Sequence, residues 1–231
     1  MVYLEFINKF TVSSLAVFVI LIPLILSLSS YSYLDKAFRL LLTFLCIDLI
    51  IGLWMFHLAA YRSNNILLLN IFVPMRYMLL GGMFIHYFHS NRNRQIIFFS
   101  IIAFIPFTII DVYTSNENLV DLHNHMVGRY SQVVESVLMI LWVLLYFYEI
   151  IKSMVVKNIT SYPFFWVCAG LLFFYSGNIF FFPFWYFMNK WENDLKLGLI
   201  EKIPYAVEIV SLLLFTIGIW NMRVQHARTE S

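Results

Sequence analysis

The sequence predicts an all-α integral membrane protein, folded as a bundle of seven transmembrane helices with its N-terminus outside and its C-terminus in the cytoplasm. Composition is the first reason: of 231 residues, 61% are hydrophobic and only 12% are charged, whereas soluble domains carry about 25% charged residues. The second reason is that the apolar residues form long runs, without the polar–apolar alternation typical of membrane β-strands. Lipid is therefore the expected solvent for most of this chain.

Seven runs reach the roughly 20 mostly apolar residues that a spanning helix needs. They lie at about 10–29, 38–61, 65–88, 95–113, 130–151, 162–187 and 203–221. The first is longer than the apolar core of a secretory signal and no small-residue cleavage site follows it, so we interpret it as a retained helix. The fourth is the shortest, and the sixth is the richest in aromatic residues. No connection is long enough to hold another domain, so residues 1–231 are expected to form a single transmembrane domain.

The orientation follows from the Lys and Arg residues in the connections, which are enriched on the cytoplasmic side of membrane proteins. Of the fifteen, eight fall on the side that holds the C-terminus, six fall on the other side, and Arg76 lies within a run. This excess predicts that the C-terminal side is cytoplasmic.

Arg76 lies near the middle of the third run, where a charge is costly unless another group pairs with it. Asp48 lies at a similar depth in the second run. Because only a few residues join these runs, the two helices should be antiparallel neighbours. We therefore expect a midplane ion pair between Asp48 and Arg76, which could be structural or functional.

A second group of polar residues is expected nearer the outer surface. Glu135, Glu208, His57 and Asn178 come from four different runs and fall at a similar level, with Tyr205 close by. Each could alone be an interfacial carboxylate or a helix-joining amide. Their convergence favours an outward-open polar pocket that binds a ligand.

Asp121, His123 and His125 lie in the connection after the fourth run. Carboxylate and imidazole are zinc ligands, so these three residues are the candidates for a metal site, although an H-x-H spacing is not specific. Histidines there could instead respond to pH. The sequence predicts no other cofactor.

Several seven-helix families are disfavoured by missing residues: the seventh run has no lysine for a retinal and no histidine pair for a zinc hydrolase, and the chain has no Pro-Gln dipeptide. PFFW at 163–166 and GLLFFYSGN at 170–178 resemble the sixth helix of uncharacterised bacterial seven-helix proteins associated with sensor histidine kinases. The resemblance implies a signalling accessory role and carries over no catalytic residues.

We therefore expect a sensor or receptor-like accessory of the bacterial cytoplasmic (inner) membrane. It would detect a small ligand or an envelope condition through the outer pocket and relay it to a separate cytoplasmic protein such as a histidine kinase. One alternative is a small proton- or cation-coupled transporter, and another is a structural subunit of a membrane complex. We expect no enzymatic activity and no nucleic-acid partner, and the oligomeric state stays open.

Overall fold

The computed structural model describes residues 2–116, 118, 121, 123–153, 159–182 and 202–229. Their regular secondary structure is helical throughout. The helices are α1 (Val2–Lys9), α2 (Thr11–Val19), α3 (Leu21–Ser29), α4 (Lys36–Ala60), α5 (Ile66–Tyr87), α6 (Asn91–Ser115), α7 (Ser131–Ser153), α8 (Pro163–Asn178) and α10 (Ile203–Thr229), with short 3₁₀ turns at Tyr31–Tyr33 and Ile159–Ser161.

Six segments of the described chain are long and apolar enough to cross a membrane. They correspond to the first five predicted runs and the last one, so an integral membrane protein with several spans is confirmed. The sixth predicted run is represented by α8, whose 16 residues cover about 24 Å, less than the roughly 30 Å of a hydrocarbon core. The end of that run, residues 183–187, lies outside the described residues.

The first crossing consists of two collinear helices, α2 and α3, with a turn at Ile20 between them. Pro23 explains the interruption, because its ring nitrogen cannot donate to the carbonyl of Val19. Pro74 and Pro106 lie inside α5 and α6, which both continue past them.

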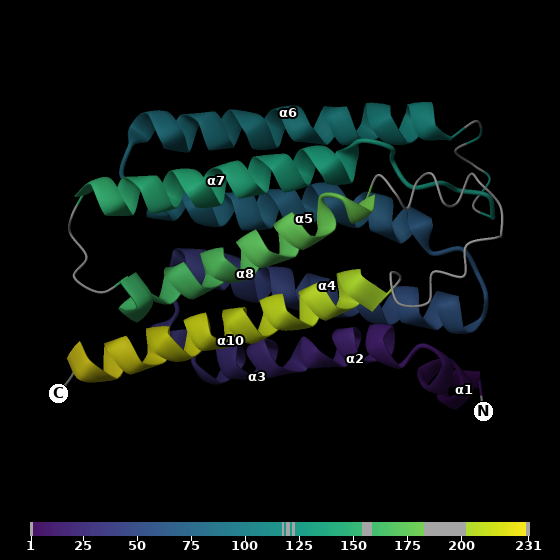
Figure 1. Ribbon diagram of the computed structural model, residues 1–231, viewed down its shortest axis with the longest axis horizontal. Helices are drawn as coiled ribbons and strands as arrows, with labels where there is room; N and C mark the ends of the chain where they lie inside the picture. Colours follow the sequence, from purple (N-terminus) through teal and green to yellow (C-terminus); the bar gives the residue numbers. More distant parts are fainter. Residues whose placement is uncertain are drawn as a thin grey trace.

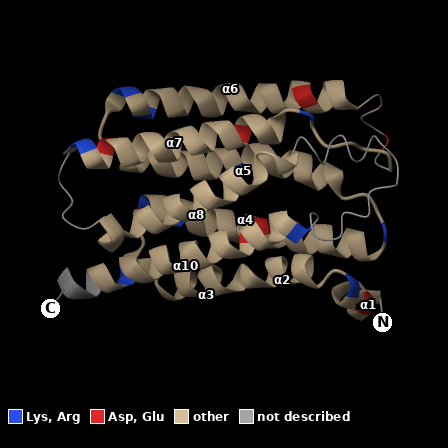
Figure 2. Ribbon diagram, viewed as in Figure 1, with Lys and Arg blue, Asp and Glu red and all other residues tan. Residues whose placement is uncertain are grey.

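The long helices lie roughly side by side, and the two chain termini are at opposite ends of the bundle (Figure 1). The N-terminal end holds α1 and the first residues of α5, α7 and α10. The C-terminal end holds the first residues of α4, α6 and α8. Lys and Arg lie mostly near these two ends, and few charged residues lie between them (Figure 2).

Helices α8 and α10 pack closely along their length because glycines lie at the interface between them. A Cβ atom on Gly170 would lie 2.8 Å from the Phe215 ring, and one on Gly218 would lie 2.9 Å from the carbonyl oxygen of Pro163. Small residues allow such close backbone approach between membrane helices. The two helices therefore form one unit.

Helices α6 and α7 cap one another. Asp111, near the end of α6, accepts hydrogen bonds from the backbone N–H groups of Tyr130 and Ser131, at 3.0 and 2.7 Å, where α7 begins. Glu149, near the end of α7, accepts from the N–H groups of His89 and Ser90, at 2.8 and 3.0 Å, where α6 begins. A carboxylate also interacts favourably with the positive end of a helix dipole.

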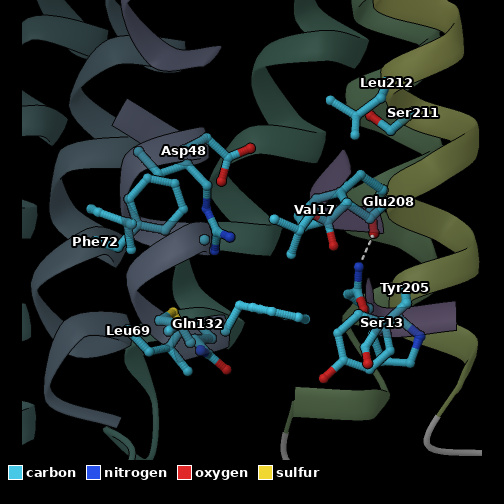
Figure 3. Close-up of a pocket in the computed structure, with 18 of the residues that line it drawn as sticks. Ser13, Val17, Asp48, Leu69, Phe72, Gln132, Tyr205, Glu208, Ser211 and Leu212 are labelled. Carbon is cyan, nitrogen blue, oxygen red and sulfur yellow. Dashed lines mark hydrogen bonds between the residues drawn. The ribbon is translucent and has the colours of Figure 1, made fainter. Parts of the chain in front are cut away.

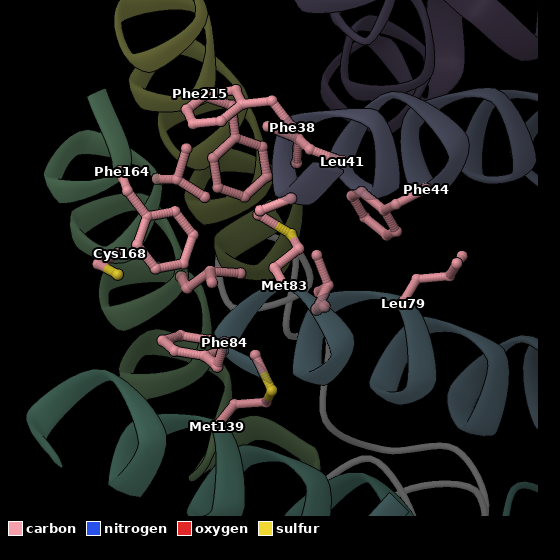
Figure 4. Packing of buried hydrophobic residues seen from close by; sticks show 14 of the residues in the cluster. Phe38, Leu41, Phe44, Leu79, Met83, Phe84, Met139, Phe164, Cys168 and Phe215 are labelled. Atoms are coloured by element: carbon pink, nitrogen blue, oxygen red, sulfur yellow. The ribbon is translucent and has the colours of Figure 1, made fainter. Parts of the chain in front are cut away.

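The C-terminal half of the bundle contains a dry core in which side chains of α4, α5, α7, α8 and α10 interlock (Figure 4). Phe38, Leu41, Met83, Phe84 and Phe164 are each fully buried there. The outer helix faces instead expose large apolar side chains, such as Phe99 and Ile109 on α6. Exposed apolar surface of this kind is suited to lipid.

Candidate functional site

A cavity of about 260 Å³ lies among α2, α4, α5, α8 and α10 in the N-terminal half of the bundle (Figure 3). Phe6 and Pro204 line it near the N-terminal end of the bundle. Its deepest lining residues along α5 and α10 are Leu80 and Phe215, where the dry core begins. Its wall is mostly apolar and aromatic, with a few charged and amide side chains.

Arg76 reaches the cavity from α5 and binds Glu135 on α7. Its Nε donates to Oε1 at 2.7 Å and its Nη2 to Oε2 at 2.5 Å, which is a two-pronged ion pair. The expected pairing with Asp48 is therefore corrected: α4 is a neighbour of α5, but the guanidinium is directed at α7. Asp48 lines the same cavity and acts on Arg76 as a nearby charge without an ion-pair contact.

Aromatic side chains complete the surroundings of this pair. Tyr175 donates a hydrogen bond of 2.7 Å to Oε1 of Glu135. The Arg76 guanidinium lies over the rings of Phe72 and Phe174, 5.5 and 5.4 Å from their centroids. The glutamate is fully buried and the arginine is 7% exposed. The rings and the carboxylate together stabilise a charge that would otherwise be costly in the membrane.

Two further carboxylates face the cavity. Asp48 on α4 and Glu208 on α10 lie on opposite walls (Figure 3). Within the described part of the chain, neither carboxylate accepts a hydrogen bond, and both are only partly buried. Arg76 and Glu135 neutralise each other, so Asp48 and Glu208 make the cavity an acidic one when they are ionised.

Asn178 lines the cavity beside these groups at the end of α8. It is 1% exposed, and its side-chain nitrogen donates to the carbonyl oxygen of Phe174 at 2.9 Å. Its Oδ1 is buried and has no partner among the described atoms. An unpaired buried acceptor is costly. Tyr205 lines the cavity from the first turn of α10.

His57 does not belong to the cavity, which corrects the expectation from the sequence. It is exposed, and its Nδ1 makes a 2.6 Å hydrogen bond with the hydroxyl of Tyr3 on α1. The reason is helical phase: nine residues separate His57 from Asp48, which at about 100° per residue places them on opposite faces of α4. Gly52, Met55 and Ala59 share the Asp48 face and do line the cavity.

The metal-site hypothesis for the loop after α6 is also corrected. Asp121 accepts from the side chain of Asn124 at 2.8 Å and from the backbone N–H of His123 at 3.1 Å, and these hydrogen bonds lower its pKa. His123 is exposed, whereas His125 is 2% exposed and both its ring nitrogens lack a partner. No group of three potential metal ligands comes together in the described part of the chain.

Sequence reasoning missed that the α6–α7 loop contributes to the wall of the cavity. Asn64 donates from its side chain to the carbonyl oxygens of His123 and His125, both at 2.9 Å, which holds the α6–α7 loop against the start of α5. Val127 of this loop and Gln132 at the start of α7 line the cavity. The clustered asparagines at the start of α5 were the available signal, because amides commonly tie loops to helix ends.

The fold and the cavity define a class, that of integral membrane proteins with several membrane-spanning helices. Comparison with models of protein families, with curated proteins and with solved structures finds no match to this chain.

Proposed function

We propose that this chain is a receptor-like module that binds a small ligand in the cavity and relays binding to a separate cytoplasmic protein. The observation that carries the proposal is the division of the bundle into halves: a cavity with a mostly apolar wall and two carboxylates in the N-terminal half, and a packed core in the C-terminal half. Such a cavity admits a ligand from one side and closes the path to the other.

The proposal includes seven crossings, with the N-terminal end outside and the C-terminal end in the cytoplasm of a bacterial inner membrane. The larger number of Lys and Arg residues at the C-terminal end supports this orientation. A histidine kinase is the proposed kind of partner, in keeping with the resemblance of residues 163–178 to kinase-associated membrane proteins.

The geometry offers a route for the relay. Asp48 belongs to α4 and Glu208 to α10, and both helices continue from the cavity to the C-terminal end. A ligand held between the two carboxylates changes the most favourable distance between α4 and α10. Because glycine contacts fix α8 to α10, these two helices move together. A ligand therefore shifts the equilibrium between two packing arrangements of the bundle.

The experiment measures a distance at the end of the bundle opposite the cavity. Spin labels are placed at Arg223→Cys on α10 and Ile151→Cys on α7, both exposed, in a chain carrying Cys46→Ala. The protein is reconstituted in lipid nanodiscs with and without a library of small metabolites. The proposal expects a ligand that shifts the distance distribution in this chain and fails to do so when Gly52→Leu fills the cavity. A bound ligand that leaves the distribution unchanged contradicts the relay.

A proton- or cation-coupled transporter is the second candidate, and the two unpaired carboxylates favour it. Helix α5 runs unbroken through Pro74 and Gly81, which differs from the interrupted helices common at transporter sites. Proteoliposomes with an imposed pH gradient separate the candidates. Accumulation of a ligand that depends on Glu208 would favour transport over sensing.

A further inference from the structure

We infer that the ligand of the cavity is a small organic cation, whose ammonium group lies between Asp48 and Glu208 and whose apolar body contacts the aromatic wall. This inference rests on the proposed ligand-binding function and names the chemical class of the ligand.

The first argument is the charge of the site. Asp48 and Glu208 both line the cavity, and neither carboxylate has a hydrogen-bond or ion-pair partner in the described part of the chain. Arg76 carries one positive charge and forms its ion pair with Glu135, so it does not balance two further carboxylates. A ligand that brings one positive charge relieves the repulsion across the cavity.

The second argument is the hydrogen-bonding character of the site. The two carboxylates are acceptors, and the Oδ1 atom of Asn178 is a buried acceptor without a partner. An ammonium group carries donors only. It therefore matches three groups that come from α4, α8 and α10, whereas a carboxylate or phosphate ligand would meet acceptors with acceptors.

The third argument is the wall. Phe72 and Phe174 flank the Arg76 side, and Phe44, Phe56 and Phe215 are also among the lining residues. Apolar rings bind the body of an organic cation and do not replace the hydration of an inorganic ion. The volume of about 260 Å³ lies near the lower end of small-molecule sites, which run from roughly 300 to 1,000 Å³. The ligand is therefore small.

The test compares three probes of nearly equal shape and different charge: 2-phenylethylamine, 2-phenylethanol and phenylacetate. Their binding to the full chain in nanodiscs at pH 7 is measured by titration calorimetry, with NaCl as the inorganic comparison. The variants are Asp48→Asn with Glu208→Gln, which removes the charge, and Gly52→Leu, which fills the cavity and leaves both carboxylates in place. Glu5→Gln is the control, because Glu5 is exposed on α1 and outside the cavity.

We expect the amine to bind at least about tenfold more tightly than the alcohol, a difference of about 1.4 kcal/mol, and phenylacetate not to bind. Both cavity variants should lose this binding and Glu5→Gln should keep it. If the charge variant does not fold, Gly52→Leu still tests the location and the three probes still test the charge.

Three results would overturn the inference, and they can be told apart. If amine and alcohol bind equally and Gly52→Leu abolishes both, the cavity binds a ligand that is not a cation. If millimolar Na⁺ displaces the amine, the ligand is an inorganic cation. In both cases the proposed function as a ligand-binding protein still stands. No binding of any probe, with Gly52→Leu indistinguishable from the unmodified protein in every assay, would remove the proposed function as well.

Discussion

Arg76 shows how a single residue can be tolerated at depth in a membrane bundle. Its guanidinium is held by two hydrogen bonds to Glu135 and by the faces of aromatic rings. Neither charged group can move to water from its buried position. Removing one partner of the pair should therefore lower stability strongly, because the other partner is then left as an uncompensated buried charge.

The first prediction concerns this pair. Arg76→Met or Glu135→Gln alone should lower the free energy of unfolding by about 3–5 kcal/mol. The double variant should lose clearly less than the sum, because both charges are removed and a glutamine can still accept the hydrogen bond from Tyr175. Unfolding in mixed detergent micelles measures all three. Arg223→Gln, at an exposed site, should change stability by less than about 0.5 kcal/mol, and strictly additive losses would show that the two charges do not interact.

The second prediction concerns His125, outside the membrane-spanning helices. Burial lowers its pKa below the ordinary value of 6.5, because its ring nitrogens have no partners to stabilise a charge. The neutral ring is favoured in the folded loop, so the loop is most stable above pH 6.5. Its stability should fall as the pH drops below that value, because protonation then favours the open chain.

Hydrogen exchange of residues 123–130 at pH 7.5 and 5.5, corrected for the intrinsic rate, measures this effect. Opening should increase at the lower pH in the unmodified protein and much less in His125→Asn. His123→Asn is the matched control, because His123 is exposed in the same loop. An equal pH response in the two variants would show that another group is responsible.

At the residue scale, the sequence was a better guide to which residues lie near one another than to which residues form hydrogen bonds or ion pairs with each other. Asp48, Arg76, Asn178, Tyr205 and Glu208 line one cavity, whereas the sequence predicted two groups at different depths, a midplane pair and an outer pocket. Glu135 and His57, predicted for the outer pocket, are not among the lining residues. The partner of Arg76 could not be predicted, because it depends on how α5 and α7 rotate about their axes. The position of His57 could have been predicted from its nine-residue separation from Asp48.

At the scale of helices, short-range contacts determine which elements behave as one unit. The reciprocal capping by Asp111 and Glu149 joins α6 and α7 at both ends. The glycines of α8 and α10 join that pair along its length. The α8–α10 unit forms one wall of the cavity, and α2, α4 and α5 form the others.

The third prediction tests the α8–α10 unit. Gly218→Val places a side chain where a Cβ atom would lie 2.9 Å from a backbone oxygen, that of Pro163. A backbone carbonyl in a helix cannot move aside as a flexible side chain can. The variant should therefore lose several degrees in melting temperature or fail to accumulate in membranes. Gly52→Ala is the control: its Cβ would lie 3.8 Å from Val17, an ordinary contact, and alanine favours a helix. Equal melting temperatures would mean that α8 and α10 are not held at this distance.

At the scale of the whole molecule, long apolar runs were enough to predict the spans, because a membrane imposes length and hydrophobicity together. Five of the seven runs have helix ends within about four residues of those predicted from the sequence. The break between α2 and α3 follows from Pro23 and could have been predicted. The division into a dry half and a half with a cavity could not, since it depends on which helices are neighbours.

The last prediction concerns the number of crossings, which turns on α8. A Cβ on Gly218 would approach Pro163 at the start of α8, and one on Gly177 near its end would lie 2.9 Å from Val207 near the start of α10. These contacts make α8 antiparallel to α10 over most of its length. Since α10 is long enough to cross, we predict that the segment that begins at Thr160 and contains α8 crosses the membrane as well.

Single cysteines in a chain with Cys46→Ala test this in intact bacterial cells with a membrane-impermeant maleimide. We expect Ser63→Cys and Lys202→Cys to be labelled, because both lie at the N-terminal end. Thr160→Cys should be labelled only after permeabilisation, because it lies at the C-terminal end. Labelling of Thr160→Cys and Lys202→Cys from the same side would mean that α8 enters the membrane without crossing it. Protection of both Ser63→Cys and Lys202→Cys, with Thr160→Cys labelled, would keep seven crossings and invert the orientation, so the cavity would then take its ligand from the cytoplasm.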